Sequence, residues 1–135
     1  MRQTFHGSVL ALIVLLLSAV PLLGHHAFQA EFDENKLLKL TGILTKIEWI
    51  NPHVYFYLDV TDQSGKLTNW ALESVTPAGL RKAGLTKSGF FEVGQTYTVT
   101  VCGAKDDSKN LAWVKDFKFP DGRVVTIWFG NPNGL

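Results

Sequence analysis

Apolar and polar residues alternate along the stretch that begins at Val54 and ends at Val60. A period of two is typical of a β-strand that turns one face towards a hydrophobic core. Tyr55 and Tyr57 occupy the polar parity of this stretch. His53 shares that parity, so we expect its side chain to point away from the core.

The same alternation recurs elsewhere and predicts strands over residues 39–50, 54–60, 67–73, 95–103, 111–119 and 124–129. In the first of these strands, Ile43, Ile47 and Trp49 share one parity. In the third strand, Asn69 and Glu73 take the outward parity. The polar stretches between the strands are rich in Gly, Asp and Ser, which are common turn residues.

A short helix is predicted between the third and fourth strands. Thr76 is a favourable N-cap, Pro77 suits the first helical position, and Gly84 provides a stop. Three strands, a helix, two strands and a trailing strand follow the order of an OB-type barrel. We therefore predict an all-β fold, a small OB-like β-barrel of five to six strands with one short helix between strands three and four. A β-sandwich is the alternative.

The N-terminal stretch has the order of a secretory signal peptide. A basic residue, Arg2, precedes an apolar run over residues 9–20, and Gly24 is a small residue at the expected cleavage point. We predict a signal peptide over residues 1–24, a single OB-like domain over residues 25–135 with an N-terminal arm over residues 25–36, and a periplasmic or secreted location. The apolar run is short for a membrane span, so we expect no stable membrane insertion after cleavage; an uncleaved anchor is the alternative.

Charge and cysteine content narrow the class of partner. Cleavage after Gly24 would remove Arg2 and leave 12 basic against 12 acidic residues, with no basic block. A neutral, exported chain argues against nucleic acid as the partner. Cys102 is the only cysteine, so no internal disulfide can form and the fold depends on its core.

Three histidines follow the predicted cleavage point: His25, His26 and His53. Imidazole is a common ligand of transition metals, and a chain that begins with His25 offers its α-amino group as well. We therefore predict a metal-binding protein, with copper as the expected metal and zinc as the alternative. Glu31 and Glu73 are candidate further ligands. The alternative interpretation is that the terminal histidines are solvated and His53 caps a turn.

A second candidate surface is the outer face of strands two and three, which carries Tyr55, Tyr57 and Asn69. Tyrosine rings stack on sugars and other planar ligands, so this face could serve as a binding module for a glycan or another envelope ligand. The alternative is that the tyrosines only cover the barrel wall. A scaffold that docks a protein partner through Phe28 and Phe32 is a third possibility. No spacing of nucleophile and base supports catalysis, and we leave enzymatic turnover open while favouring a binding protein.

Several motifs together resemble a known family. They are His-His-x-Phe-x-Ala-Glu-Phe-Asp from His25, Glu-Trp-x-Asn-Pro-His ending at His53, Asn-Trp-Ala-x-Glu ending at Glu73, and Pro-Asp-Gly-Arg ending at Arg123. The chain resembles a family of small exported bacterial proteins classified only as a domain of unknown function. The resemblance implies a single exported β-rich domain and no particular activity. The family pattern contains all three histidines, which strengthens the expectation of a metal site.

Overall fold

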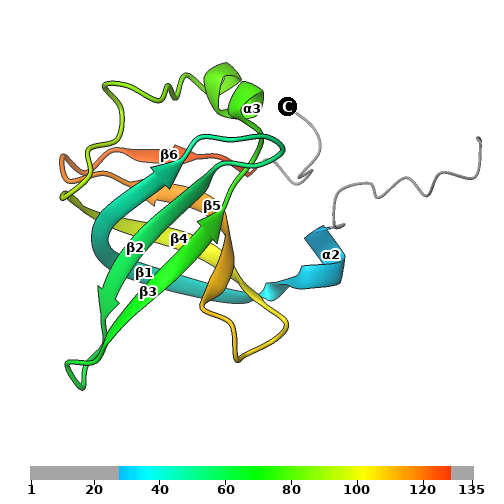
Figure 1. Cartoon of the computed structure of the whole chain (residues 1–135), viewed down its shortest axis with the longest axis vertical. Coiled ribbons are helices and arrows are strands. Elements are labelled where there is room, and N and C mark those ends of the chain that lie inside the picture. Colours follow the sequence, from blue (N-terminus) through cyan, green and yellow to red (C-terminus); the bar gives the residue numbers. More distant parts are fainter. Residues whose placement is uncertain (1–27, 129–135) are drawn as a thin grey trace, which may run out of the picture.

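The structure, a computed structural model, describes residues 28–128 of the chain (Figure 1). Within these residues the elements are α2 (Phe28–Glu31), β1 (Phe32–Glu48), β2 (Tyr55–Thr61), β3 (Leu67–Glu73), α3 (Pro77–Lys82), β4 (Thr96–Ala104), β5 (Leu111–Lys118) and β6 (Val124–Thr126). None of the helices in this range is long and apolar enough to cross a membrane.

The strands form one sheet that closes on itself. Their order is β3-β2-β1-β4-β5-β6, and an additional pairing joins β3 to β5. The β3–β5 pairing is parallel, and the other pairings are antiparallel. The ring β1-β2-β3-β5-β4 and the position of α3 between β3 and β4 confirm the prediction of an all-β, OB-like barrel. Figure 1 shows the strands wrapping around the core, with α3 at one end and α2 to one side.

The predicted helix is confirmed as α3. Thr76 has an extended backbone, and its Oγ1 accepts a hydrogen bond from the backbone N of Gly79 at 3.0 Å, which is the geometry of an N-cap. Pro77 follows at the start of the helix. Leu80 is fully buried, so α3 packs an apolar side chain against the barrel core.

The first strand is longer than the sequence predicted. β1 begins at Phe32, and Phe32 pairs with Ala104 of β4 before the ladder resumes at Leu37 opposite Cys102. The polar residues 33–36 lie in this irregular section. Residues 32–36 of the predicted arm thus lie within β1, where Phe32 is paired with β4 and buried.

The parity of β1 also differs from the sequence pattern. Leu40 and Leu44 are buried, whereas Ile43 is 48% exposed. The pairing with β2 shifts between Leu44 and Lys46, so one extra residue is inserted there and the side chains beyond it change face. Ile47, which shares sequence parity with Ile43, consequently packs against the core.

The barrel interior is filled by the apolar parity of the other strands. Phe56 and Phe117 are both fully buried, and their ring centroids lie 4.8 Å apart. Phe91, from the connection after α3, joins them at 4.8 Å from Phe56 and 5.1 Å from Phe117. This packed interior holds β2, β3 and β5 in fixed register, and the candidate site lies on the outer side of these three strands.

Candidate functional site

Three side chains form a row across the outer face of β2, β3 and β5. Tyr55 lies directly opposite Glu73 in the antiparallel β2–β3 ladder, and Glu73 lies beside Trp113 in the parallel β3–β5 ladder. The neighbouring row contains the fully buried Phe56 and Leu72, which face the barrel interior. Since successive side chains on a strand point to opposite faces, Tyr55, Glu73 and Trp113 are outside the barrel.

His53 joins this row, but its environment differs from the expected one. We expected its side chain to point away from the core; the ring lies on the outer face of the barrel, and it is nevertheless buried, with 8% of its surface exposed. Nδ1 of His53 is in hydrogen-bond contact with Oε1 of Glu73. The edge of the ring meets Trp113, with centroids 5.2 Å apart and planes at 87°. His53 is therefore covered by side chains on the outside of the barrel.

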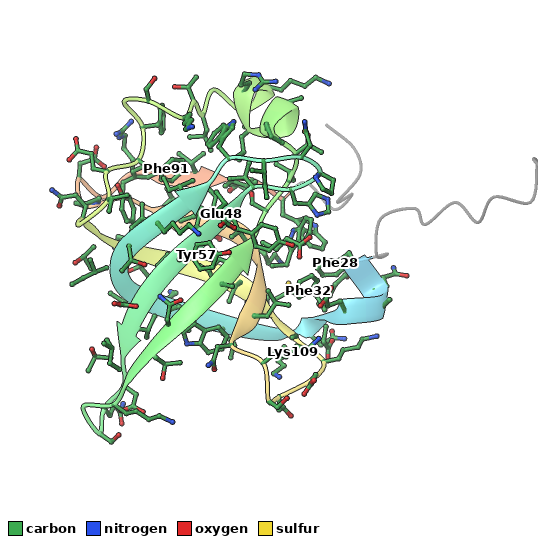
Figure 2. All side chains as sticks on the ribbon, in the orientation of Figure 1. Phe28, Phe32, Glu48, Tyr57, Phe91 and Lys109 are labelled. Atoms are coloured by element: carbon green, nitrogen blue, oxygen red, sulfur yellow. The ribbon has the colours of Figure 1, made fainter. Side chains whose placement is uncertain are left out.

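Four aromatic residues, Phe28, Phe32, Trp113 and Trp128, pack together and meet His53 through Trp113, and we call them the aromatic layer. The centroid of the Phe28 ring lies 4.2 Å from the ring centroid of Trp128, 5.6 Å from that of Trp113 and 5.5 Å from that of Phe32. Figure 2 shows Phe28 and Phe32 side by side where α2 meets β1. Phe28 and Phe32 pack onto the domain, since both are buried.

Trp113 and Trp128 were not among the predicted residues of this region. A signal was present, because residues 111–114 are apolar without interruption. Such a run is typical of a strand that is buried on both faces. Trp113 is 2% exposed, and its Nε1 has no hydrogen-bond partner among the described residues.

Glu73 is the central polar group of the site. It is 7% exposed, so its carboxylate requires partners inside the protein. Its partner is Nδ1 of His53. The pKa of Tyr55, which faces Glu73 across the β2–β3 ladder, is raised first by burial and then by the charge of Glu73. Glu73 thus has His53 as its hydrogen-bond partner and Tyr55 as its neighbour on the adjacent strand.

The arm is tied to the loop between β4 and β5. The backbone N–H of Lys105 donates to the carbonyl oxygen of Glu31 at 2.9 Å, and Nζ of Lys105 donates to the carbonyl oxygen of Gln29 at 2.6 Å. The Glu31 carboxylate lies 3.7 Å from Nζ of Lys109, which Figure 2 labels below Phe32. Glu31, an expected metal ligand, therefore pairs with Lys109, and its charge also acts on Tyr55.

The other two residues of the expected ligand-binding face have separate partners. The hydroxyl of Tyr57 donates to Oε2 of Glu48 at 2.8 Å, and Figure 2 shows these two side chains together. Nζ of Lys46 lies over the Tyr57 ring, 5.1 Å from its centroid. Nδ2 of Asn69 donates to an oxygen of Asp59 at 2.7 Å. Tyr55, Tyr57 and Asn69 share one face, and the side chains of Tyr57 and Asn69 donate hydrogen bonds to different carboxylates.

Of the five expected metal ligands, the structure brings together His53 and Glu73. His25 and His26 lie outside the described residues. Within residues 28–128, no group of three or more His, Cys, Asp or Glu side chains is placed to hold a metal ion. The described part of the chain therefore supplies one imidazole and the carboxylate that orients it.

Comparison with known proteins gives a family and no activity. No curated protein and no solved structure matches the chain. The model of a family of unknown function, DUF6152, matches residues 13–112, a stretch that contains His25, His26, His53 and Glu73. Because this match covers well over half of the 135 residues, the chain belongs to the family of unknown function DUF6152.

Proposed function

We propose that the protein is an exported, periplasmic metal-binding protein that holds copper through His53 together with His25 and His26. The observation that carries the proposal is the contact between Nδ1 of His53 and the buried carboxylate of Glu73. Zinc is the alternative metal. The role is metal carriage or buffering, with no turnover required.

The Glu73 contact gives His53 the form of a metal ligand. An ionised carboxylate only accepts hydrogen bonds, so Nδ1 of His53 is the nitrogen that carries the proton. In the neutral ring, Nε2 then bears the lone pair. Metal-binding histidines commonly donate their second ring N–H to a carboxylate in this way, which fixes both the tautomer and the ring orientation. Glu73 thus fits the role of an orienting residue better than that of a direct ligand.

The position of Phe28 supports a role for the N-terminal histidines. The rings of Phe28 and His53 both contact Trp113, with centroid separations of 5.6 and 5.2 Å. An extended chain covers at most about 3.6 Å per residue, so two or three residues span at most about 7 or 11 Å. The proposal requires that the short stretch before Phe28 allows His26 and His25 to reach His53.

Copper is preferred because of the chemistry of the donor set. Cleavage after Gly24 would give His25 a free α-amino group, so the terminus would supply an amine and an imidazole in one chelate. Nitrogen donors in such an arrangement suit Cu(II), which also binds more tightly than zinc to a given nitrogen site. The proposal requires the apolar run over residues 9–20 to act as a cleaved signal for export.

The test is the intact mass of the exported protein under native conditions, with one equivalent of Cu(II) and a competing chelator. We expect a mass that begins at His25 and one retained copper ion. His53→Gln and a variant with one residue added before His25 should each weaken binding at least tenfold, on the order of the effect expected for loss of a ligand or of its orientation. Tyr57→Phe, which removes a hydroxyl bonded to Glu48, is the matched control and should bind as the wild type does.

Two results would overturn the proposal. One is a mass that begins at another residue together with unchanged copper binding, because the terminal chelate would then not exist. The other is the absence of retained copper and zinc in the wild type. In that case the outer face with Tyr57 and Asn69 becomes the leading candidate, and binding of envelope glycans to Tyr57→Ala should be compared with binding to the wild type.

A further inference from the structure

We propose that a second binding site lies beside the β5–β6 turn, where Arg123 binds the carboxylate and Glu92 the ammonium of a free amino acid or dipeptide. The turn carries the Pro-Asp-Gly-Arg motif that ends at Arg123, which the proposed copper site does not use. The two sites share no residue, so this inference goes beyond the proposed function and does not depend on it.

A cavity of about 290 Å³ lies between this turn and the connection that joins α3 to β4. Figure 1 shows the connection and the turn on the same side of the barrel, away from α2. The volume is near the lower end of the range for small-molecule sites, which suits a ligand of one or two amino acid residues. The side chains that line the cavity include those of Phe90, Glu92, Gln95, Phe119, Asp121 and Arg123.

Arg123 is held in place by its own turn and by two aromatic rings. Its backbone N donates to Oδ1 of Asp121 at 3.0 Å, and its Nε donates to Oδ2 of the same carboxylate at 2.6 Å. The guanidinium carbon lies 5.4 Å from the ring centroid of Phe119 and 5.7 Å from that of Phe90, within the range of cation–π contacts. Within residues 28–128 Asp121 is its only ion-pair partner, so the two Nη groups are left for a planar carboxylate.

The opposite wall of the cavity is also held by hydrogen bonds of the protein. The backbone N of Glu92 donates to the hydroxyl of Tyr97 at 2.9 Å, and Tyr97 is 2% exposed. The carbonyl oxygen of Gln95 accepts a hydrogen bond from the backbone N of Leu44 in β1 at 2.9 Å. Because both walls are fixed before a ligand arrives, binding requires little further ordering of the chain.

The charges around the cavity select the class of ligand. Its charged lining residues are one cation, Arg123, and two anions, Glu92 and Asp121. A simple anion such as phosphate would meet this excess of negative charge, and a simple cation would leave the Arg123 fork unpaired. A ligand with both charges satisfies both walls. Since Asp121 is already paired with Arg123, Glu92 is the partner for the ammonium.

The experiment is a ¹H–¹⁵N NMR titration of the metal-free exported protein with L-alanine and with L-alanyl-L-alanine. We expect the amide signals of Glu92, Gln95 and Arg123 to shift and to saturate at millimolar ligand, as befits so small a molecule. The dipeptide amide lacks the carboxylate, and the N-acetylated dipeptide lacks the ammonium. Each should bind roughly tenfold more weakly than the free dipeptide, the effect of losing one charged hydrogen-bonding group.

Variants assign the two charges to their partners. Arg123→Gln should weaken binding of the dipeptide by roughly tenfold or more, and Glu92→Gln should abolish the difference between the free and the acetylated dipeptide. Lys118→Gln is the matched control, because it removes one positive charge from the end of β5 outside the cavity and should bind as the wild type does. If Arg123→Gln loosens the turn, Arg123→Lys replaces it, since lysine keeps the charge and loses only the planar fork.

Three results would each overturn the inference. One is the absence of shifts in the wild type with either ligand. Another is equal binding of the dipeptide and its amide, because the carboxylate would then not be recognised. The third is unchanged binding in both Arg123→Gln and Arg123→Lys. Copper binding should be the same in Arg123→Gln as in the wild type, so the two proposals can fail separately.

Discussion

Replacing Phe28 with alanine should release α2 from the barrel while the barrel itself stays folded. Phe28 is 4% exposed and contacts three rings of the aromatic layer, those of Phe32, Trp113 and Trp128. The hydrogen bonds from Lys105 to the backbone of the arm depend on the same docked position. Loss of Phe28 should therefore remove the main apolar contact of a four-residue helix.

The magnitudes indicate that the arm docks with a small net free energy. Truncating a buried Phe to Ala typically costs about 3–5 kcal/mol. Ordering the backbone costs about 1–2 kcal/mol per residue, or roughly 4–8 kcal/mol for the four residues of α2. Because these terms are of similar size, Phe28→Ala should lower the global free energy of unfolding by no more than about 2 kcal/mol.

Hydrogen exchange and denaturation together check this expectation. In Phe28→Ala, exchange of the Lys105 amide, which donates to Glu31, should rise by about tenfold or more, while amides of the central strands keep their protection. The matched control is Phe117→Ala in the barrel interior, where a fully buried ring is removed. That variant should lose about 3–5 kcal/mol and reduce protection throughout the barrel.

Two results together would refute this expectation. Phe28→Ala would destabilise the whole protein as much as Phe117→Ala does, and the Lys105 amide would exchange no faster than the amides of the central strands. The arm would then be part of the cooperative core. For the proposed copper site, the expected release implies weaker copper binding in Phe28→Ala, because the segment that carries His25 and His26 would no longer be tied to the barrel at Phe28.

Three further predictions concern local features. Gly42→Ala should destabilise the barrel by about 1–3 kcal/mol in urea denaturation, because an added Cβ would lie 2.4 Å from the backbone oxygen of Asp59; a stable variant would contradict the close approach of β1 and β2. Thr76→Ala should cost about 0.5–2 kcal/mol, since the bond from Gly79 to the N-cap is lost, whereas Thr76→Ser should retain most of the stability. Burial and a neighbouring carboxylate raise the pKa of Tyr55. Its contribution to stability is therefore complete below the unfolded-state pKa of about 10 and declines as the pH rises above that pKa. Tyr55→Phe should therefore reduce the fall of the free energy of unfolding with pH in alkaline denaturation curves.

The local elements followed closely from the sequence. β3 has the predicted bounds, and α3 begins at the Pro77 that follows the predicted N-cap Thr76. These features depend on alternation, capping and proline geometry, which act over a few residues. The order of the elements was then sufficient to predict the OB-like barrel. The face of Ile43 was not predictable in the same way, because the inserted residue after Leu44 is visible only in the pairing with β2.

The candidate site was predictable by residue type and only partly by position. His53, Glu73 and Tyr55 were all singled out as polar residues on outward parities. From the sequence, His53 and Tyr55 were assigned to separate surfaces. In the structure both lie next to Glu73, His53 by a hydrogen bond and Tyr55 as its partner in the β2–β3 ladder. The burial of His53 depends on Trp113, which lies 60 positions further along the chain.

By itself, the sequence determined the strands, the short helix, their order and the chemical groups of the site. Only the tertiary structure decided which of these groups meet. The register of β3 between β2 and β5 places Glu73 between Tyr55 and Trp113, and the Trp113 ring packs against His53. The physical reason is that secondary structure arises from interactions between near neighbours in the chain. A buried polar pair arises from barrel closure, which brings distant residues together and removes water from between them.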